Sequence, residues 1–252
     1  MRTLPADPSV VDEKMKKAIV IGASSGIGRE LSKILSRSQY TVGVMARRVQ
    51  LLDELRREMG DDMLVEGIDV SDAESAKAAL TKLIEKMGGV ELVVMSAGTG
   101  HLNAELDWGL ENDAIKTNVT GFAAIANIAV KHFMERGSGH LVGISSIAAL
   151  RGGRESPAYN ASKAFESNYL EGLRQKVRKL GLPITITDIK PGFVKTAMAK
   201  GDSIFWAAEA DKAAMQIYDA IKRRKSGAYI TRRWRLVAWV IKSLPGFVYE
   251  RL

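Results

Sequence analysis

Four polar residues carry the clearest chemical signal in this chain: Asn118, Ser146, Tyr159 and Lys163. Tyr159 and Lys163 stand four residues apart, so on a helix they lie on one face. Ser146 follows the apolar run 141–144, which is typical of the end of a buried strand. A tyrosine whose ionised form is favoured by a nearby ammonium group can give a proton to a carbonyl oxygen, or take one from an alcohol. We therefore predict acid–base chemistry at a carbon–oxygen bond, with Tyr159 as the proton donor.

The other three residues support this chemistry. Lys163 would favour the tyrosinate form of Tyr159, and Ser146 would hydrogen-bond the reacting oxygen. Asn118 would hold a water molecule that links Lys163 to solvent. Each residue alone has an ordinary explanation, as a partly buried helix residue, a surface lysine, a strand-end cap or a polar residue inside a helix. Their combined spacing, downstream of a glycine loop, favours a catalytic site.

The glycine loop has the sequence Gly-Ala-Ser-Ser-Gly-Ile-Gly and directly follows the apolar run 18–21. Small residues let the backbone approach a pyrophosphate, and a helix that starts here supplies N–H donors and positive potential. No Lys followed by Ser or Thr ends the loop, which disfavours a nucleotide triphosphatase. A tight strand-to-helix turn without a ligand is the alternative. The residues predicted to hold a dinucleotide here are Gly22, Ser24, Ser25, Gly26, Ile27 and Gly28.

Arg47 and Arg48 follow the second apolar run, at the position where proteins that use NAD carry an acid for the ribose hydroxyls. Guanidinium groups pair with a 2′-phosphate instead, so we predict that NADP(H) is favoured over NAD(H) as the cofactor. The alternative is that both arginines simply begin a solvated helix. Asp69 can accept a hydrogen bond from the adenine amino group, and Val70 can pack beside the ring. Ala97–Gly98 would pass close to the adenosine ribose.

Strand-like apolar runs alternate with longer segments of helical period along the chain. Strands are expected at 18–21, 41–45, 63–68, 91–95, 140–144, 184–189 and 228–230, and helices at 27–36, 50–59, 73–87, 111–135 and 158–180. Strands joined by such helices form right-handed parallel crossovers, with helices on both faces of the sheet. We predict an α/β fold, a single doubly wound parallel sheet of Rossmann type over residues 16–230. A mobile extension, 1–15, precedes it and a tail, 231–252, follows it.

Composition narrows the function classes further. The 252 residues include no cysteine and three histidines, none spaced as a metal ligand, so we expect a metal-independent mechanism. The net charge is +8, with seven basic residues and no acidic one from 222 to 235. Because no nucleic-acid motif accompanies them, we expect no nucleic-acid partner. The lack of cysteine and of any run of 18 apolar residues favours a cytoplasmic protein without a spanning helix.

Together these motifs resemble the short-chain dehydrogenase/reductase family, from about Lys16 to about Tyr229. The likeness rests on the glycine loop, Asp69–Val70, Ala97–Gly98, Asn118, Ser146, the Tyr-Asn-Ala-Ser-Lys run at 159–163, and Pro191–Gly192. It implies an NAD(P)-dependent enzyme that interconverts a ketone and a secondary alcohol and forms a homodimer or homotetramer through its two long helices. It also implies that Pro191–Gly192 belong to the cofactor turn. There Val194 would contact the nicotinamide carboxamide through the backbone, and Thr196 would hydrogen-bond it.

This chain departs from the family pattern at two places. Ile21 stands where a threonine is usual before the first glycine, and Met95–Ser96 stand where two asparagines are usual. Both changes affect the support of neighbouring strands more than the chemistry. The segment 193–208, where the family places its substrate lid, is apolar through Met198, Ile204, Phe205 and Trp206. It predicts a small-molecule carbonyl or alcohol substrate that is apolar or lipid-linked. The alternative is that these side chains only pack the lid down.

The tail has its own pattern. Apolar residues recur at helical spacing among several cations, at Trp234, Val237, Ala238, Ile241 and Leu244. Such a helix can lie peripherally on an anionic membrane, or it can pack on the domain or on a partner subunit. The tail is weakly similar to the ends of some bacterial reductases that act on lipid-linked sugars. A rival function is a nucleotide-binding scaffold or sensor that uses this tail to reach a membrane or a partner.

Overall fold

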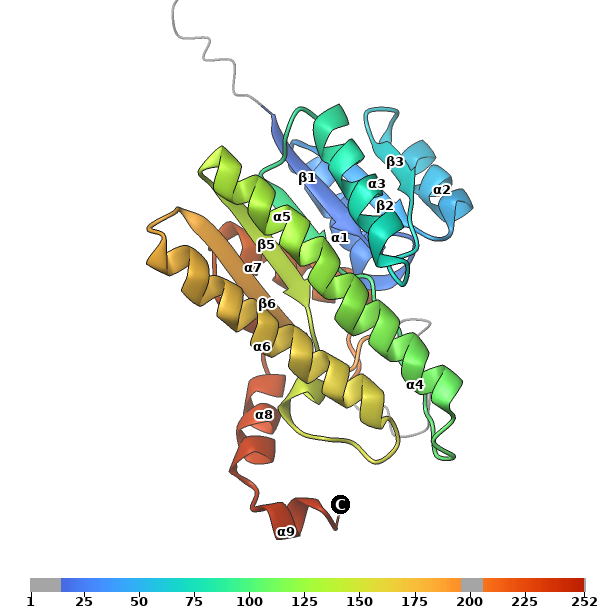
Figure 1. Ribbon diagram of the computed structural model, residues 1–252, viewed down its shortest axis with the longest axis vertical. Coiled ribbons are helices and arrows are strands. Elements are labelled where there is room, and N and C mark those ends of the chain that lie inside the picture. Colours follow the sequence, from blue (N-terminus) through green and yellow to red (C-terminus); the bar gives the residue numbers. More distant parts are fainter. Residues whose placement is uncertain (1–14, 196–205, 252) are drawn as a thin grey trace, which may run out of the picture.

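The structure is a computed structural model that describes residues 15–195 and 206–251. Strands and helices alternate along the chain (Figure 1). The strands are β1 Lys16–Ile21, β2 Tyr40–Ala46, β3 Leu64–Gly67, β4 Leu92–Met95, β5 Gly139–Ile144, β6 Ile184–Pro191 and β7 Gly227–Ile230. The helices are α1 Gly26–Arg37, α2 Val49–Met59, α3 Ala73–Lys86, α4 Trp108–Ile115, α5 Phe122–Arg136, α6 Pro157–Lys179, α7 Ala210–Lys222, α8 Trp234–Ser243 and α9 Gly246–Tyr249. Of the predicted N-terminal extension only Met15 is described, so the prediction for residues 1–14 lies outside the described chain.

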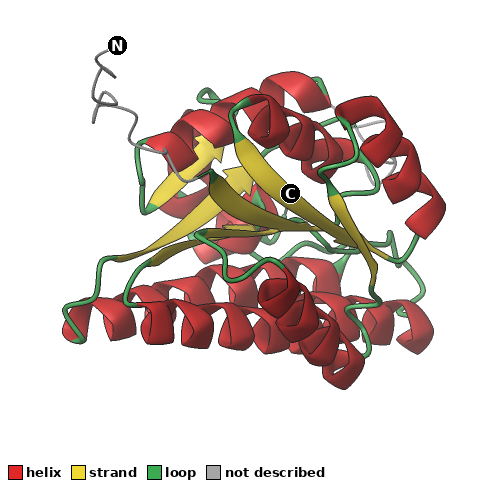
Figure 2. Ribbon diagram, turned by 90° about the horizontal axis from the view of Figure 1, so that it is seen from above, coloured by secondary structure: helices red, strands yellow, loops and turns green. Residues whose placement is uncertain are grey.

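The seven strands of the described chain form one parallel sheet in the order β3-β2-β1-β4-β5-β6-β7. Helices cover both faces, as Figure 2 shows from above. Each face has its own apolar core, because successive side chains of a strand point to opposite sides. Ile19 packs in the core with α3, α5 and α6, whereas Val20 packs in the core with α1, α2 and α7. The predicted doubly wound α/β fold is confirmed.

The helix predicted over 111–135 is wrong as a single unit. The structure begins it at Trp108, where Asp107 caps the first turn by accepting from the backbone N–H of Leu110. A wider π-type turn over Lys116–Gly121 then separates α4 from α5. At its end a side chain on Gly121 would collide with the carbonyl oxygen of Val70, so the helix approaches the segment after β3 closely there. Single π turns of this kind often occur at functional sites, and this one contains Asn118.

The sequence-based expectation omitted one helix and treated the helical tail as a single helix. Helix α7 was not predicted, yet its apolar stripe packs against α1. The tail forms α8 and the short α9, which lie beside the lower end of the sheet in Figure 1. Among the described residues, no helix is both long enough and apolar enough to cross a membrane.

Candidate active site

The carboxyl ends of β1 and β4 mark the point where the strand order reverses, which is where ligands bind in open parallel sheets. The glycine loop lies here. Gly22 has a φ of +88°, and a side chain on it would collide with the backbone of Ser96 and Ala97. A side chain on Gly28 would collide with the carbonyl oxygen of Gly22. Helix α1 starts at Gly26, and Ser25 does not cap it with its side chain, so a bound phosphate could take those N–H groups.

Of the two arginines after β2, Arg48 contacts the glycine loop and Arg47 lies near Asp69. Arg48 donates from Nη2 to Ser24 Oγ at 2.9 Å and to Ser25 Oγ at 2.8 Å. Arg47 Nη1 lies 3.9 Å from Asp69 Oδ2, and both side chains of that pair are largely exposed. The loop serines and two guanidinium groups therefore gather at one end of the sheet edge. Their positive charge and hydroxyl groups suit a phosphate that carries two negative charges.

Residues predicted to contact the adenosine lie along the same edge. Asp69 Oδ1 accepts from the N–H and the hydroxyl of Ser71, at 2.9 and 2.7 Å, so one carboxylate oxygen is already used within its own turn. Val70 is almost buried and belongs to the apolar core. The backbone of Ala97 packs against Gly22, and Gly98 lies beside the ammonium group of Lys163. Ile21, the first departure from the family pattern, is fully buried in the core.

Asn118 is fully buried, and both ends of its side-chain amide bind the protein. Its Oδ1 accepts from the backbone N–H of Thr99 at 2.9 Å. Its Nδ2 donates to the carbonyl oxygen of Thr99 at 2.7 Å and to Ser162 Oγ at 2.9 Å. Asn118 thus ties the π-type turn Lys116–Gly121, the loop after β4 and α6 together. Asn118 and Lys163 both border Gly98. A Cβ atom on Gly98 would lie 3.3 Å from Asn118 Oδ1 and 3.2 Å from Lys163 Nζ, so the two side chains are neighbours.

Tyr159 and Ser146 lie at the open end of this cluster, each half-buried. The ring of Tyr159 packs on Gly100, where any side chain would come within 2.7 Å of the ring. Lys163 Nζ lies 5.9 Å from the centre of that ring. Ser146 begins a short 3₁₀ turn over Ile147–Leu150 and accepts from the N–H of Ala148 at 3.1 Å. Gly100 was missed in the sequence, although a second glycine so soon after Ala97–Gly98 is a usable signal.

Lys163 has a partner that the sequence analysis did not single out. Its ammonium group donates to both carboxylate oxygens of Glu166, at 2.9 and 3.0 Å, and to the carbonyl oxygen of Ile144 at 3.2 Å. Burial lowers the pKa of Lys163, but the negative charges of Glu166, Tyr159 and Asp188 outweigh it and raise the pKa above its usual value. Burial raises the pKa of Glu166 to about 7, although the ammonium group of Lys163 opposes this. An i, i+3 Lys–Glu spacing looks like an ordinary surface pair, so only burial distinguishes it.

The cofactor turn after β6 is partly described. Gly192 lies under the indole ring of Trp234, so that a side chain on Gly192 would overlap the ring. Val194 is buried and pairs with Ala208 in an isolated parallel bridge. The prediction for Thr196 lies outside the described residues, as do those for Met198, Ile204 and Phe205. Within the described ranges, no three His, Cys, Asp or Glu residues are arranged to hold a metal ion.

The sequence of this chain is similar to those of known oxidoreductases. A family model described as "short chain dehydrogenase" matches residues 16–204. An "Uncharacterized oxidoreductase" of Myxococcus xanthus is 41% identical over 188 residues, which cover 73% of this chain and 74% of the relative.

Two solved structures show the same fold. The structure "ElxO with NADP Bound" superposes with a TM-score of 0.73 at 24% identity, covering 81% of this chain and 90% of that one. A short-chain dehydrogenase/reductase from Burkholderia phymatum in complex with NAD gives a TM-score of 0.79 at 20% identity, covering 89% and 92%. Proteins of this fold thus include one bound to NADP and one bound to NAD.

Proposed function

Because this chain belongs to the short-chain dehydrogenase/reductase family and is an NAD(P)-dependent oxidoreductase, we propose that it reduces a ketone to a secondary alcohol, or the reverse, with NADP(H). One observation carries the proposal: Tyr159, Lys163 and Asn118 meet at the carboxyl edge of the sheet, beside a glycine loop that two arginines flank. When bound, the nicotinamide supplies or accepts a hydride. The side chains of this chain bind the cofactor, orient the substrate and transfer the proton.

In the proposed reduction, Tyr159 gives its hydroxyl proton to the oxygen of the carbonyl group as negative charge develops there. Ser146 hydrogen-bonds the same oxygen and so fixes the orientation of the substrate. Lys163 stabilises the tyrosinate that remains, through its positive charge 5.9 Å from the ring. Asn118 holds the loop after β4 against α6 through its three hydrogen bonds. These bonds support a role in which Asn118 also orders the water that resupplies the proton.

The preference for NADP(H) is supported by Arg48, whose guanidinium group already lies within hydrogen-bond distance of both loop serines. A 2′-phosphate at this position would gain charge-assisted hydrogen bonds, which a 2′-hydroxyl could not match. Calorimetric titration of the purified protein with NADPH and with NADH tests this. We expect NADPH to bind at least about tenfold tighter, equivalent to about 1.4 kcal/mol. Equal affinities would refute the preference.

An apolar substrate is supported by the loop that follows β4. Gly100 touches Tyr159, and a few residues later Leu102, Leu106 and Trp108 are exposed. An open depression of about 420 Å³ nearby is lined by Leu102, Ala104 and Leu110 together with the polar residues Asn103, Glu105 and Asp107. We propose that this rim favours ketones with long or bulky apolar groups, lipid-linked ones included. A cofactor-coupled screen should show kcat/KM rising with the apolar length of the ketone, and the opposite trend would contradict the proposal.

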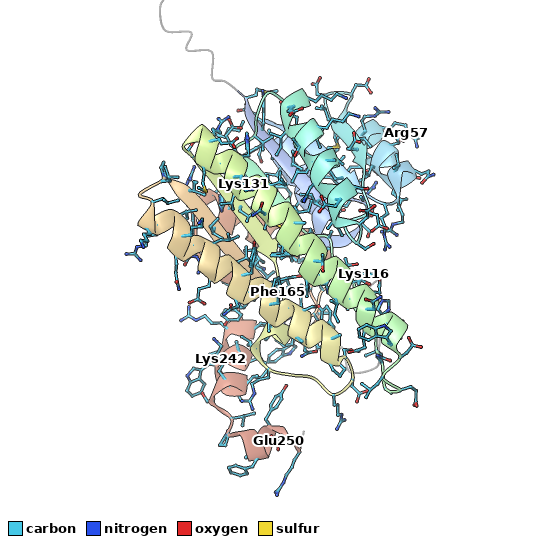
Figure 3. The ribbon with its side chains drawn as sticks, viewed as in Figure 1. Arg57, Lys116, Lys131, Phe165, Lys242 and Glu250 are labelled. Atoms are coloured by element: carbon cyan, nitrogen blue, oxygen red, sulfur yellow. The ribbon has the colours of Figure 1, made fainter. Side chains whose placement is uncertain are left out.

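We also propose a homodimer or homotetramer that forms through α5 and α6, which lie side by side in Figure 1. Phe165 and Tyr169 stack on one another at 5.5 Å along α6, and Figure 3 labels Phe165 on this helix. Light scattering should give a mass of two or four chains. A variant with both aromatic residues changed to Ser should shift the mass towards one chain.

Peripheral membrane contact is proposed for the tail, but through a different face from the one that the sequence pattern singles out. Trp234 and Ala238 are buried against the domain, so that face packs on the protein. Arg151 donates to the carbonyl oxygen of Leu244 at 3.0 Å, and Tyr249 donates to that of Gly152 at 2.6 Å. These contacts hold the tail beside the 3₁₀ turn that follows Ser146.

The outer face of α8 carries a second apolar stripe with cations beside it. Leu236, Trp239 and Val240 are exposed, and so is Phe247 of α9. Their spacing of three and four residues places the first three on one face, opposite the buried stripe. Arg235 and Lys242 flank Trp239 at helical spacing, and Figure 3 shows Lys242 on this outlying helix. Exposed Trp and Leu with neighbouring cations suit the surface of an anionic bilayer.

Co-sedimentation with vesicles of phosphatidylglycerol and phosphatidylcholine tests the outer stripe. Trp239→Ser should weaken binding at least about fivefold, and Lys242→Glu should do so most strongly at low salt. Trp108→Ser is the matched control, because Trp108 is 68% exposed and Trp239 is 70% exposed. Binding by neither wild type nor control would end the proposal. A change of oligomeric mass in Leu236→Ser would instead identify the stripe as a contact between copies of this chain.

A further inference from the structure

Helix α6 buries a carboxylate directly behind the catalytic lysine. Glu166 has 0% of its surface exposed, and Lys163 has 5%. Lysine has three donor hydrogens, and here three acceptors surround it: the two oxygens of Glu166 and the carbonyl oxygen of Ile144. The position of Nζ is therefore set by its neighbours on α6 and β5.

Other charges face this pair from the neighbouring strand. Asp188 on β6 accepts from Ser145 Oγ and from Ser167 Oγ, each at 2.5 Å, and forms an ion pair with Lys190. Asp188 repels the carboxylate of Glu166, whereas Tyr159 lies on the other side of Lys163, on the same helix. Two acids and two lysines thus share the interior below the catalytic tyrosine. Ion pairs this deep tolerate the loss of one partner poorly, because the remaining charge is left without compensation.

We propose that Glu166 is a positioning residue for the proposed reaction: its carboxylate keeps the buried ammonium group of Lys163 charged and holds it in place behind Tyr159. The inference rests on the proposed function only for its effect on turnover. Burial alone favours a neutral lysine, and Lys163 supports the tyrosinate only while it is positive. A neutral amide at position 166 keeps the shape of the side chain but removes the negative charge. That charge offsets the lowering of the pKa of Lys163 by burial. Lys163 then loses its proton at a lower pH.

Glu166→Gln and Glu166→Asp separate charge from shape. In Glu166→Gln we expect kcat to fall about tenfold at its optimum. The alkaline fall of the pH profile should begin at least about one pH unit lower than in wild type. In Glu166→Asp the charge remains, so kcat should return to within about threefold of wild type and the alkaline limb to its place. Glu74→Gln is the matched control, since Glu74 forms an i, i+3 pair with Lys77 but is exposed. It should change nothing.

The apo protein gives a second reading that does not depend on turnover. The pKa of Glu166 is raised to about 7 in the folded protein, against 4.5 as its ordinary value. Its contribution to stability is therefore present below pH 4.5 and is lost as the pH rises to about 7. As the pH rises from 4.5 to about 7, the Tm of wild type should therefore fall relative to the Tm of Glu166→Gln.

Two results would overturn the proposal. One is a Glu166→Gln enzyme that is slower but has the pH profile of wild type, and the other is a Glu166→Asp enzyme as impaired as the Gln variant. If no ketone is reduced by wild type, the proposed function fails. The Tm values then still decide the pair: a loss of Tm in Glu166→Gln no larger than that in the exposed control Glu74→Gln would show that Glu166 does not compensate the buried ammonium group.

Discussion

The two ends of the same sheet edge hold their charges in opposite ways. At the proposed adenosine end, Arg47 and Arg48 are exposed, and their long, flexible side chains contact Asp69 and the loop serines respectively. At the proposed catalytic end, Lys163 and Glu166 are buried and hydrogen-bonded to each other. Exposed charges are screened by salt and water, so they suit recognition of a charged group that arrives from solution. Buried charges are expensive to place but keep one position and one strong field, as proton transfer requires.

The largest effect is expected from a substitution that should abolish turnover at the proposed catalytic end while NADPH binding is retained. Tyr159→Phe removes the hydroxyl group that we propose as the proton donor, and it removes almost no volume. We expect kcat to fall by about 10² to 10⁴, the usual contribution of general acid–base catalysis, with the Kd for NADPH changed by less than about threefold. Tyr169→Phe, on the same helix, is the control and should retain normal turnover. An unchanged kcat in Tyr159→Phe would remove Tyr159 from the chemistry.

The reverse separation is expected at the adenosine end. Arg48→Ala should raise the Kd for NADPH by about 10- to 100-fold, because hydrogen bonds to charged groups contribute about 1.5–3 kcal/mol. The Kd for NADH and the kcat at saturating NADPH should stay close to wild type. Arg57→Ala provides the control, since Arg57 is exposed on α2, where Figure 3 labels it, and among the described residues its side chain donates only to the backbone of its own helix at Asp53. Equal weakening of both cofactors would mean that Arg48 supports the loop and does not recognise the phosphate.

Salt should sharpen the contrast with a smaller effect. The screening length falls from about 10 Å at 0.1 M to about 3 Å at 1 M. Between these concentrations NADPH binding should weaken several-fold more than NADH binding. The pH values at which kcat rises and falls should hardly change, because the Lys163–Glu166 pair is buried and salt screens it little. A pH profile that shifts as much as the NADPH affinity would show that both ends are equally open to solvent.

The smallest effect on activity is expected at a buried group far from the chemistry. His140 lies at the start of β5, bound to Thr187 at 2.8 Å, and burial together with the charge of Arg224 lowers its pKa to about 4. The unfolded chain takes up this proton near pH 6.5, so stability falls as the pH drops from 6.5 towards 4, by about 3 kcal/mol at most. Urea denaturation should show a shallower acid loss in His140→Gln, with normal turnover at pH 7. A lower kcat would show that the two ends of β5 are coupled.

Local spacing was enough to predict the main parts of this protein. The alternation of apolar runs and helical segments predicted the parallel sheet, and the glycines after β1 were expected to open a helix, as they do in α1. Tyr159 and Lys163 could be placed on one face because helical geometry relates residues four apart. The roles of the site residues in catalysis and cofactor binding remain proposals. The arginines at 47 and 48 indicated a phosphate site from charge alone.

Burial and the approach of distant segments were decided only by the tertiary structure. A π-type turn interrupts the predicted helix where Gly121 contacts the backbone of Val70. No local sequence pattern predicts a contact between these two residues. Glu166 and Lys163 have the spacing of a surface pair, yet Glu166 is completely buried and is close enough to Asp188 on β6 to be repelled by it. The tail has two apolar stripes. One packs on the domain, where Trp234 lies against Gly192, and the other is exposed. The physical reason is common to all three: periodicity relates neighbours within one element, whereas burial depends on which remote segment covers a side chain.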